Sequence, residues 1–143
     1  MFYKPMLLPL LALVFLTFIV WFYMYVTRLA EIRRKRIDPQ DLDTRIHSQS
    51  LLIDSPRQAD NLKNLFEVPV LYYGLCLYLF VSGNVDSGYV VAAWLFFLFR
   101  AFHSVVHCTR NIVMLRFYLY SGAALSLWFM LGKALIGELA VYF

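Results

Sequence analysis

The chain has few of the residues that build disulfide-linked or turn-rich domains. Its 143 residues include two cysteines, five prolines and six glycines, and no fixed-period repeat is visible. Only 15% of the residues are charged, whereas 62% are hydrophobic, compared with roughly 45–50% in a soluble domain. The composition therefore excludes an ordinary soluble domain and predicts an integral membrane protein, with a length that suits one compact bundle.

The cysteines and the net charge point to no further class of function. Cys76 lies in the middle of one apolar segment and Cys108 near the end of the next. At about 1.5 Å of rise per residue they fall at different depths, so we expect two passive thiols rather than a disulfide. The net charge of +4 does not indicate nucleic-acid binding, because the basic residues gather beside a predicted span.

Four apolar segments predict transmembrane helices at about 6–27, 60–82, 87–110 and 112–136. The first contains an uncharged run at 6–26, and about 20 residues suffice to span a bilayer. This run is too long for a signal-peptide core and no small-residue cleavage site follows it. The expected fold class is an all-α membrane protein, with residues 1–143 forming a single four-transmembrane-helix bundle and a polar loop at about 28–59.

Lysine and arginine are distributed unequally between the two sides of the predicted membrane. The side of the first and third connections holds Arg28, Arg33, Arg34, Lys35, Arg36, Arg45, Arg57, Arg110 and Arg116. The other side holds only Lys4 and Lys133. Since short cytoplasmic loops carry the excess of basic residues, we expect the long loop in the cytoplasm and both termini outside it.

Polar residues recur at helical spacing in the third apolar segment. Arg100, His103, His107 and Arg110 are separated by 3, 4 and 3 residues, which places them on one stripe of a helix. Charged groups in hydrocarbon cost several kcal/mol each unless they are paired, hydrated or turned toward protein. This stripe is therefore the first place to look for function.

The predicted topology brings further polar residues to the same depth. The expected layer in the cytoplasmic leaflet consists of Asn64, Glu67, Arg100, His103, His107 and Arg116. From spacing alone it has three interpretations: a polar clamp that fastens the helices, a binding site for an anion, or a metal site on the two histidines. A metal site is the weakest of these, because no thiolate or second carboxylate ligand accompanies Glu67.

Two motifs carry a resemblance to a known family. The first is Asn-Leu-Phe-Glu at 64–67, followed by Val-Pro-Val-Leu-Tyr-Tyr at 68–73, and the second is Arg100-x-x-His103-Ser104-x-x-His107, followed by Asn111 and Arg116. Asn-x-x-Glu alone is a weak signal, but its combination with Arg-x-x-His and Arg116 is specific. The chain resembles the MAPEG family, the membrane-associated proteins of eicosanoid and glutathione metabolism. The resemblance covers all four spans and the long loop, and it is nearest to the bacterial branch.

The resemblance implies a homotrimer in a bacterial inner membrane, with glutathione as co-substrate bound between adjacent subunits near the cytoplasmic side. The residues that match the family's glutathione site are Lys63, Asn64, Glu67, Arg100, His103, His107 and Tyr120. Arg116 matches the arginine that supports the glutathione thiolate and is the implied catalytic residue. The chemistry is reasonable, because cations pair with carboxylates and favour the thiolate of a thiol whose free pKa is about 8.5.

The chain also departs from the family pattern. Lys63 stands where eukaryotic members often have an arginine, and lysine lacks the bidentate fork, while His107 stands where a tyrosine is common. Phe117 follows Arg116, where one prostaglandin-forming enzyme has a serine, so that enzyme's serine chemistry is not expected here. The family's arginine at the end of the first helix has three candidates, Arg28, Arg33 and Arg34.

These observations favour a membrane-bound glutathione-dependent transferase or peroxidase acting on lipophilic electrophiles that enter from the bilayer. The expected partners are a second and third copy of the chain, membrane lipids and a lipophilic small molecule, with no nucleic acid and no metal. The alternative is a non-catalytic lipid-binding or scaffold protein with the same bundle, since some family members bind lipid without catalysis.

The topology is open to a direct test. Single cysteines introduced at Arg33 or Arg36 should react with a membrane-impermeant maleimide only when it reaches the cytoplasmic face. Cysteines near either terminus should react from the opposite face. Protection of the long loop from the cytoplasmic side would contradict the orientation inferred from the basic residues.

Overall fold

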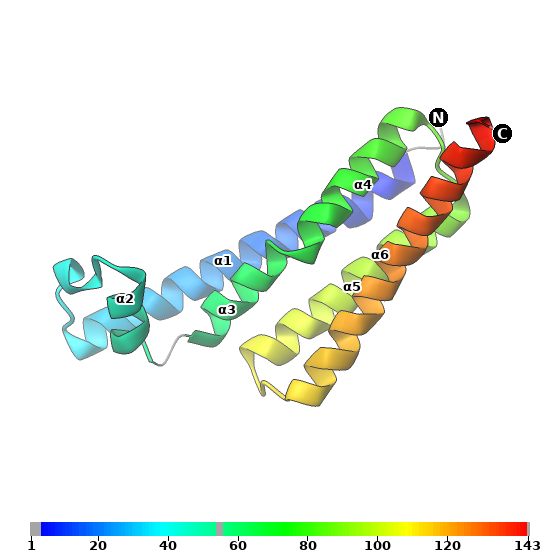
Figure 1. Ribbon diagram of the computed structural model, residues 1–143. Helices are drawn as coiled ribbons and strands as arrows, with labels where there is room; N and C mark the ends of the chain where they lie inside the picture. The colour runs from blue at the N-terminus through cyan, green and yellow to red at the C-terminus, as the bar shows by residue number, and fades with distance from the viewer. Residues whose placement is uncertain (1–3, 54–55, 143) are drawn as a thin grey trace.

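The computed structural model describes residues 4–53 and 56–142, and the described residues form helices and connections without strands (Figure 1). The α-helices are α1 (Leu7–Lys35), α2 (Arg45–Leu51), α3 (Pro56–Leu65), α4 (Val68–Ser82), α5 (Ser87–Cys108) and α6 (Val113–Tyr142). Two short 3-10 helices are η1 (Lys4–Met6) and η2 (Pro39–Leu42). The stretches long and apolar enough to cross a membrane are Leu7–Lys35, Arg57–Ser82, Ser87–Cys108 and Val113–Ala140. The predicted all-α fold with four transmembrane helices is confirmed, and the chain is an integral multi-pass membrane protein.

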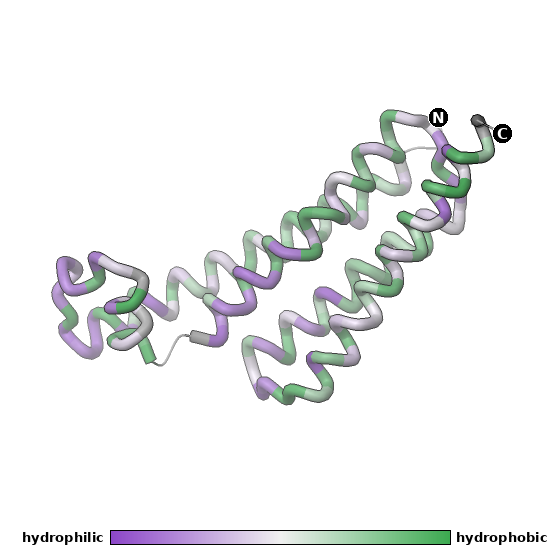
Figure 2. The backbone as a smooth tube through the Cα atoms, in the orientation of Figure 1, coloured by the Kyte–Doolittle hydropathy of each residue, from purple (hydrophilic) through white to green (hydrophobic). Residues whose placement is uncertain are grey.

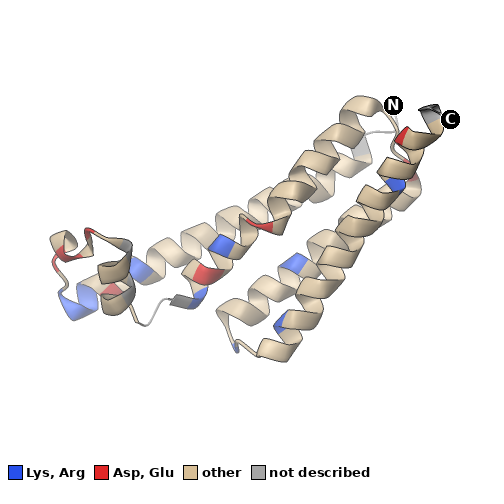
Figure 3. Cartoon of the chain, viewed as in Figure 1, with Lys and Arg blue, Asp and Glu red and all other residues tan. Residues whose placement is uncertain are grey.

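The long helices run roughly parallel to a common axis. In Figure 1, α1 lies beside α3 and α4, and α5 lies beside α6. Contacts of α5 with α1 and α3 join these two groups of helices. The first turn of α1 and the last turn of α6 lie at the same end of the bundle, while the region around α2 lies at the other. Figure 2 shows hydrophilic residues concentrated around α2, and Figure 3 shows that charged residues are sparse along the middle of α1.

The first helix is longer than the sequence predicted, ending at Lys35 rather than near residue 27. Its 29 residues span about 43 Å, which exceeds a hydrocarbon core of about 30 Å. The basic last turn of α1 therefore extends beyond the membrane. The chain leaves the helix through Arg36, whose backbone is left-handed at φ 51°.

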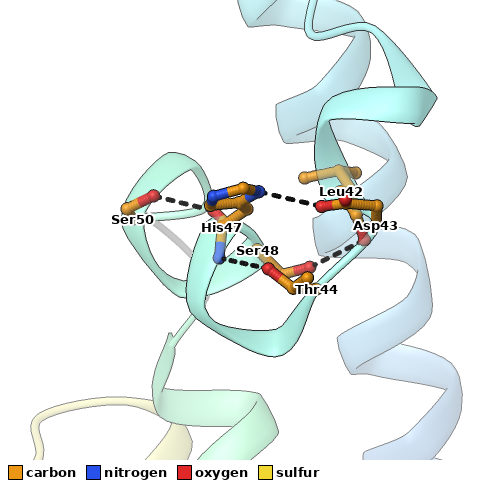
Figure 4. Close-up of polar contacts among 6 residues, drawn as sticks. All are labelled: Leu42, Asp43, Thr44, His47, Ser48 and Ser50. Carbon is orange, nitrogen blue, oxygen red and sulfur yellow. Dashed lines mark hydrogen bonds and ion pairs between the residues drawn. The ribbon is translucent and has the colours of Figure 1, made fainter.

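The predicted loop at 28–59 is partly helical. Besides the end of α1, it contains η2, α2 and the start of α3. Figure 4 shows that the contacts around α2 are local: the His47 backbone N–H donates to Thr44 Oγ1 at 3.2 Å, and the His47 ring lies 2.8 Å from Asp43. The α2 region is also tied to α1, since Lys35 donates to the Leu51 carbonyl at 3.2 Å.

The second span is interrupted, where the sequence predicted one continuous helix at 60–82. The helix α3 ends at Leu65, and α4 begins at Val68. Pro69 explains the break, because proline lacks a backbone N–H and its ring collides with the carbonyl four residues earlier, which is that of Leu65. Glu67 stands in the break with φ −98° and ψ −106°, so its side chain lies at a junction of two helices.

Close packing joins α5 to its neighbours. The Tyr72 ring of α4 stacks on Phe96 at 4.3 Å with an interplanar angle of 6°, and both side chains are buried. On α6, Gly122 faces Phe99 so closely that an added Cβ would lie 2.8 Å from the ring. The absence of a side chain at Gly122 thus lets α5 and α6 approach each other.

An ion pair fastens the turn between α4 and α5 to α6. Asp86 caps α5, since its Oδ1 accepts the backbone N–H groups of Gly88 at 2.9 Å and Tyr89 at 3.2 Å. The carboxylate also pairs with the Lys133 ammonium. The hydrogen bond from Lys133, helped by those from the two backbone N–H groups, holds the pKa of Asp86 below its ordinary value.

Two substitutions at Asp86 separate its charge from its role as a cap. Asp86→Asn keeps a capping side chain and should cost less than about 1 kcal/mol, the usual limit for an exposed pair. Asp86→Ala also loses the cap and should cost about 1 kcal/mol more. Thermal unfolding in mild detergent at neutral pH measures both effects.

The contribution of the charge should depend on pH. Folding lowers the pKa of the Asp86 carboxyl below its ordinary value of 3.8. The ionised carboxylate therefore stabilises the folded protein fully at pH values above 3.8. This stabilisation is lost as the pH falls through the pKa that Asp86 has in the folded protein. The wild type and Asp86→Asn should therefore become equally stable at strongly acidic pH. A difference between them that persisted there would contradict the ion-pair account.

Candidate functional site

The polar stripe predicted on the third span is buried along α5. Arg100 is 0% exposed, His103 2% and His107 4%. The fourth member, Arg110, differs from the prediction, because α5 ends at Cys108 and Arg110 lies exposed in the following turn. Three polar side chains of the stripe thus face the protein rather than lipid, as the cost of burying charge in hydrocarbon requires.

Arg100 links α5 to the end of α3. Its Nη2 donates to the backbone carbonyl of Asn64 at 2.6 Å, and its Cζ lies 5.8 Å from the centroid of the Tyr120 ring on α6. Its Nε and Nη1 have no hydrogen-bond partner among the described residues. A buried guanidinium held by a neutral carbonyl and an aromatic face keeps its positive charge, so it makes the surrounding region attractive to anions.

The two histidines of the stripe are stacked on each other. Their ring centroids are 5.6 Å apart with an interplanar angle of 19°, and the His103 ring lies 6.3 Å from Tyr120. The Nδ1 atoms of both histidines are buried without a partner in the described part of the chain. These two Nδ1 atoms therefore make no hydrogen bond to another helix within the described residues.

The helix α3 and its break supply a second polar stripe. Arg57, Asp60, Asn64 and Glu67 follow one another at spacings of 3, 4 and 3 residues, the same pattern as on α5. Only Asn64 and Glu67 belong to the site predicted from the sequence. Extending their spacing toward the N-terminus of α3 identifies Arg57 and Asp60 as well, so the signal was present in the sequence.

Two neighbouring cavities lie between these stripes. The larger, here named the polar cavity, has a volume of about 500 Å³ and is lined by Arg57, Asp60, Lys63, Asn64, Glu67, His107, Asn111 and Arg116. The smaller, here named the inner cavity, has a volume of about 220 Å³ and is lined by Asn64, His103, Val113, Arg116, Phe117 and Tyr120. Asn64 and Arg116 line both, so the two cavities meet at these side chains.

The structure thus brings the predicted site residues together. Those that line a cavity are Lys63, Asn64, Glu67, His103, His107, Arg116 and Tyr120. Arg100 lines neither cavity and lies fully buried behind Asn64. The three candidates at the end of the first helix, Arg28, Arg33 and Arg34, line neither cavity within this single chain.

The acidic and basic groups of the polar cavity are only partly paired. Lys63 lies 3.1 Å from the Asp60 carboxylate, and Arg57 donates to the Thr109 carbonyl at 2.9 Å. Arg116 donates from Nη1 to the Asn111 side-chain oxygen at 2.5 Å, and its Nε is buried without a partner among the described residues. Since a neutral amide holds Arg116, its charge remains available at the junction of the cavities.

Other polar side chains in the same region fasten helices. Asn61 is fully buried on α3, accepts a hydrogen bond from Ser104 Oγ at 3.3 Å and donates to Cys108 Sγ at 3.4 Å. None of the three lines either cavity. Part of the polar layer is therefore a helix clamp, and that clamp is distinct from the groups around the cavities.

The site offers no evident metal centre. Among residues 4–53 and 56–142, no group of three or more His, Cys, Asp and Glu side chains is arranged to hold a metal ion. The described groups suit an organic anion better, because cations outnumber unpaired acids around a cavity large enough for a small molecule.

Comparisons with known proteins add one finding. The family model described as the MAPEG family matches residues 6–136, which include the first three spans, most of the fourth and every residue that lines the two cavities. No curated protein and no solved structure matches the chain.

Arg100→Ala tests whether the buried arginine supports binding. The change leaves the Asn64 carbonyl without its donor and removes a positive charge behind the cavities, so it should weaken binding of the expected glutathione ligand. The effect should be smaller than the roughly 1.5–3 kcal/mol of a direct charged hydrogen bond, because Arg100 lines neither cavity. Calorimetric titration of the detergent-purified protein measures the affinity. Asn61→Ala is the matched control, and it should lower the melting temperature with little effect on affinity. Unchanged binding by Arg100→Ala, accompanied by loss of assembly, would make Arg100 a helix clamp.

Proposed function

The chain belongs to the MAPEG family, and from this premise we propose that it is a membrane-bound glutathione-dependent transferase or peroxidase acting on lipophilic electrophiles. Membership supports a glutathione-related membrane function in general. The finer proposal depends on one observation: the guanidinium of Arg116 stands where the polar and inner cavities meet, with a neutral amide as its partner.

Glutathione would occupy the polar cavity. It has two carboxylates and one amino group, and the cavity offers cations at Arg57 and Lys63, besides Arg116, with carboxylates at Asp60 and Glu67. Arg57 and Lys63 would hold the two carboxylates of the tripeptide. Cations pair with the carboxylates of a ligand and acids with its ammonium group. Asn64 and His107 add neutral polar contacts that would orient the peptide.

The thiol of the bound tripeptide would be directed at Arg116. A nearby cation favours the thiolate over the thiol, which has a free pKa of about 8.5. The N-terminal end of α6, where Arg116 is the fourth residue and ends the first turn, also favours negative charge. The thiolate would then attack the electrophilic atom of the second substrate, forming a new bond from sulfur and displacing a leaving group or opening a ring.

The lipophilic substrate would approach through the inner cavity. Val113 and Phe117 line this cavity and are 69% and 59% exposed on the membrane-spanning helix α6. An apolar compound dissolved in the bilayer would therefore reach the thiolate from the lipid side, while glutathione would arrive from the cytoplasm. We further propose a homotrimer with glutathione between adjacent subunits, as the family resemblance suggests.

Arg116→Leu tests the catalytic role. Glutathione binding should remain largely intact, but conjugation of a chloronitrobenzene at neutral pH should fall about ten- to a hundredfold, as the loss of a charged contact predicts. The ultraviolet absorbance of the bound thiolate should fall in parallel. Arg110→Leu is the matched control, because this arginine is exposed in the turn that precedes α6 and lines neither cavity.

The outcomes distinguish the enzyme from its alternative. If Arg116→Leu retains both rate and absorbance, Arg116 is an interfacial anchor only. If the wild-type protein shows neither thiolate absorbance nor conjugation, the chain is a non-catalytic lipid-binding or scaffold protein instead of an enzyme. A thermal-shift series with glutathione completes the test, since a ligand at 100 times its dissociation constant should stabilise the protein by about 2.7 kcal/mol.

A further inference from the structure

The turn between α5 and α6 contains an asparagine, Asn111, whose backbone shapes the turn and whose side chain contacts Arg116. Asn111 has a left-handed backbone with φ 54°, and its N–H donates to the Val106 carbonyl at 2.7 Å. This arrangement ends α5 and reverses the chain into α6. Asparagine and aspartate adopt this conformation more readily than most residues, and glycine adopts it without strain.

The backbone alone does not require an asparagine at this position. Glycine would serve the turn equally well, so the amide must be explained by what it contacts. The Asn111 Oδ1 accepts a hydrogen bond from Arg116 Nη1 at 2.5 Å, and Asn111 itself lines the polar cavity. The side chain therefore reaches from the turn to the guanidinium that lies at the junction of the two cavities.

The contact fixes Arg116 without neutralising it. An arginine side chain has several rotatable bonds and loses up to about 2 kcal/mol of conformational entropy when it is held in one geometry. A hydrogen bond to a rigid turn removes part of that freedom before the ligand binds. An aspartate would hold the guanidinium as firmly, but its charge would cancel the charge that a thiolate needs.

We propose that Asn111 is a positioning residue that holds the Arg116 guanidinium toward the bound thiol while leaving its charge intact. The role rests on the proposed glutathione-dependent function. Asn111 would thereby help to set the acidity of the bound thiol. It is a neutral hydrogen-bond acceptor on a left-handed turn, five residues before Arg116.

Other charged and titratable groups also face this region. They are Arg57, Asp60, Lys63 and Glu67 from α3 and its break, His103 and His107 from α5, and Tyr120 from α6. All of them are retained when only Asn111 changes. The ratio of variant to wild-type rate at each pH therefore isolates the contribution of Asn111.

Two substitutions separate the role of the Asn111 side chain from that of the turn, and a third is a control. Asn111→Gly keeps the left-handed backbone and removes the acceptor. Asn111→Asp keeps the acceptor and adds a negative charge. Asn84→Ala is the control, since this exposed asparagine lies in the turn between α4 and α5 at the opposite end of α5. Circular dichroism and melting temperature in detergent establish that each variant is folded.

The measurements are the thiolate absorbance of bound glutathione and the rate of conjugation, both followed against pH. With Asn111→Gly the pKa of the bound thiol should rise by about one unit, so absorbance and rate should fall about tenfold below that pKa and converge with the wild type at alkaline pH. Asn111→Asp should lose more thiolate absorbance and conjugation rate than Asn111→Gly, because its negative charge opposes formation of the thiolate. Asn84→Ala should match the wild type.

The outcomes distinguish the positioning role of Asn111 from a purely structural role and from failure of the proposed function. An Asn111→Gly protein with the wild-type pH profile overturns the positioning role alone, and so does a loss of rate that is equal at every pH, which indicates a structural effect. A wild type that forms no thiolate and conjugates nothing overturns the proposed function, and the role of Asn111 falls with it.

Discussion

The hydrogen bond from the Arg100 guanidinium to the Asn64 carbonyl organises the site. The last carbonyls of any helix have no partner within the helix, and Pro69 forces α3 to end inside a membrane-spanning segment, where water is scarce. Arg100 provides a donor for one of these carbonyls from the neighbouring helix α5. The same contact gives a partner to a charge that would otherwise be costly to bury, and it sets α3 at a fixed position relative to α5.

That constraint explains why the polar groups gather in one place. With α3 and α5 held together, the stripe that ends at Glu67 faces the stripe that contains His103 and His107. The clamp formed by Asn61 and Ser104 also joins α3 to α5, nearer to the cytoplasmic ends predicted for these helices. The clamp and the cavities are therefore two parts of one layer, in which some polar groups join helices and others remain available to a ligand.

The charged side chains fall into two groups according to whether their hydrogen-bond partner is charged or neutral. Lys63 and Lys133 each have a carboxylate partner, at Asp60 and Asp86. Arg100 and Arg116 instead have neutral oxygens as partners, from a backbone carbonyl and an amide. Pairing with a neutral acceptor satisfies a guanidinium locally while preserving its field, which is the property that an anion-binding site requires.

The sequence by itself determined the membrane class and the four spans, because apolar runs of bilayer length have few other solutions. The 3–4 spacing of polar residues, the predicted topology and the resemblance to the MAPEG family together also named most of the residues that line the two cavities. The sequence also contained the signal for Arg57 and Asp60, which continue the spacing of Asn64 and Glu67. Only the tertiary structure decided that Arg100 lies behind the cavities and that Arg110 lies outside the stripe. Local periodicity specifies which face of a helix is polar, but where a helix ends and which side chain lies in front depend on contacts between segments far apart in the chain.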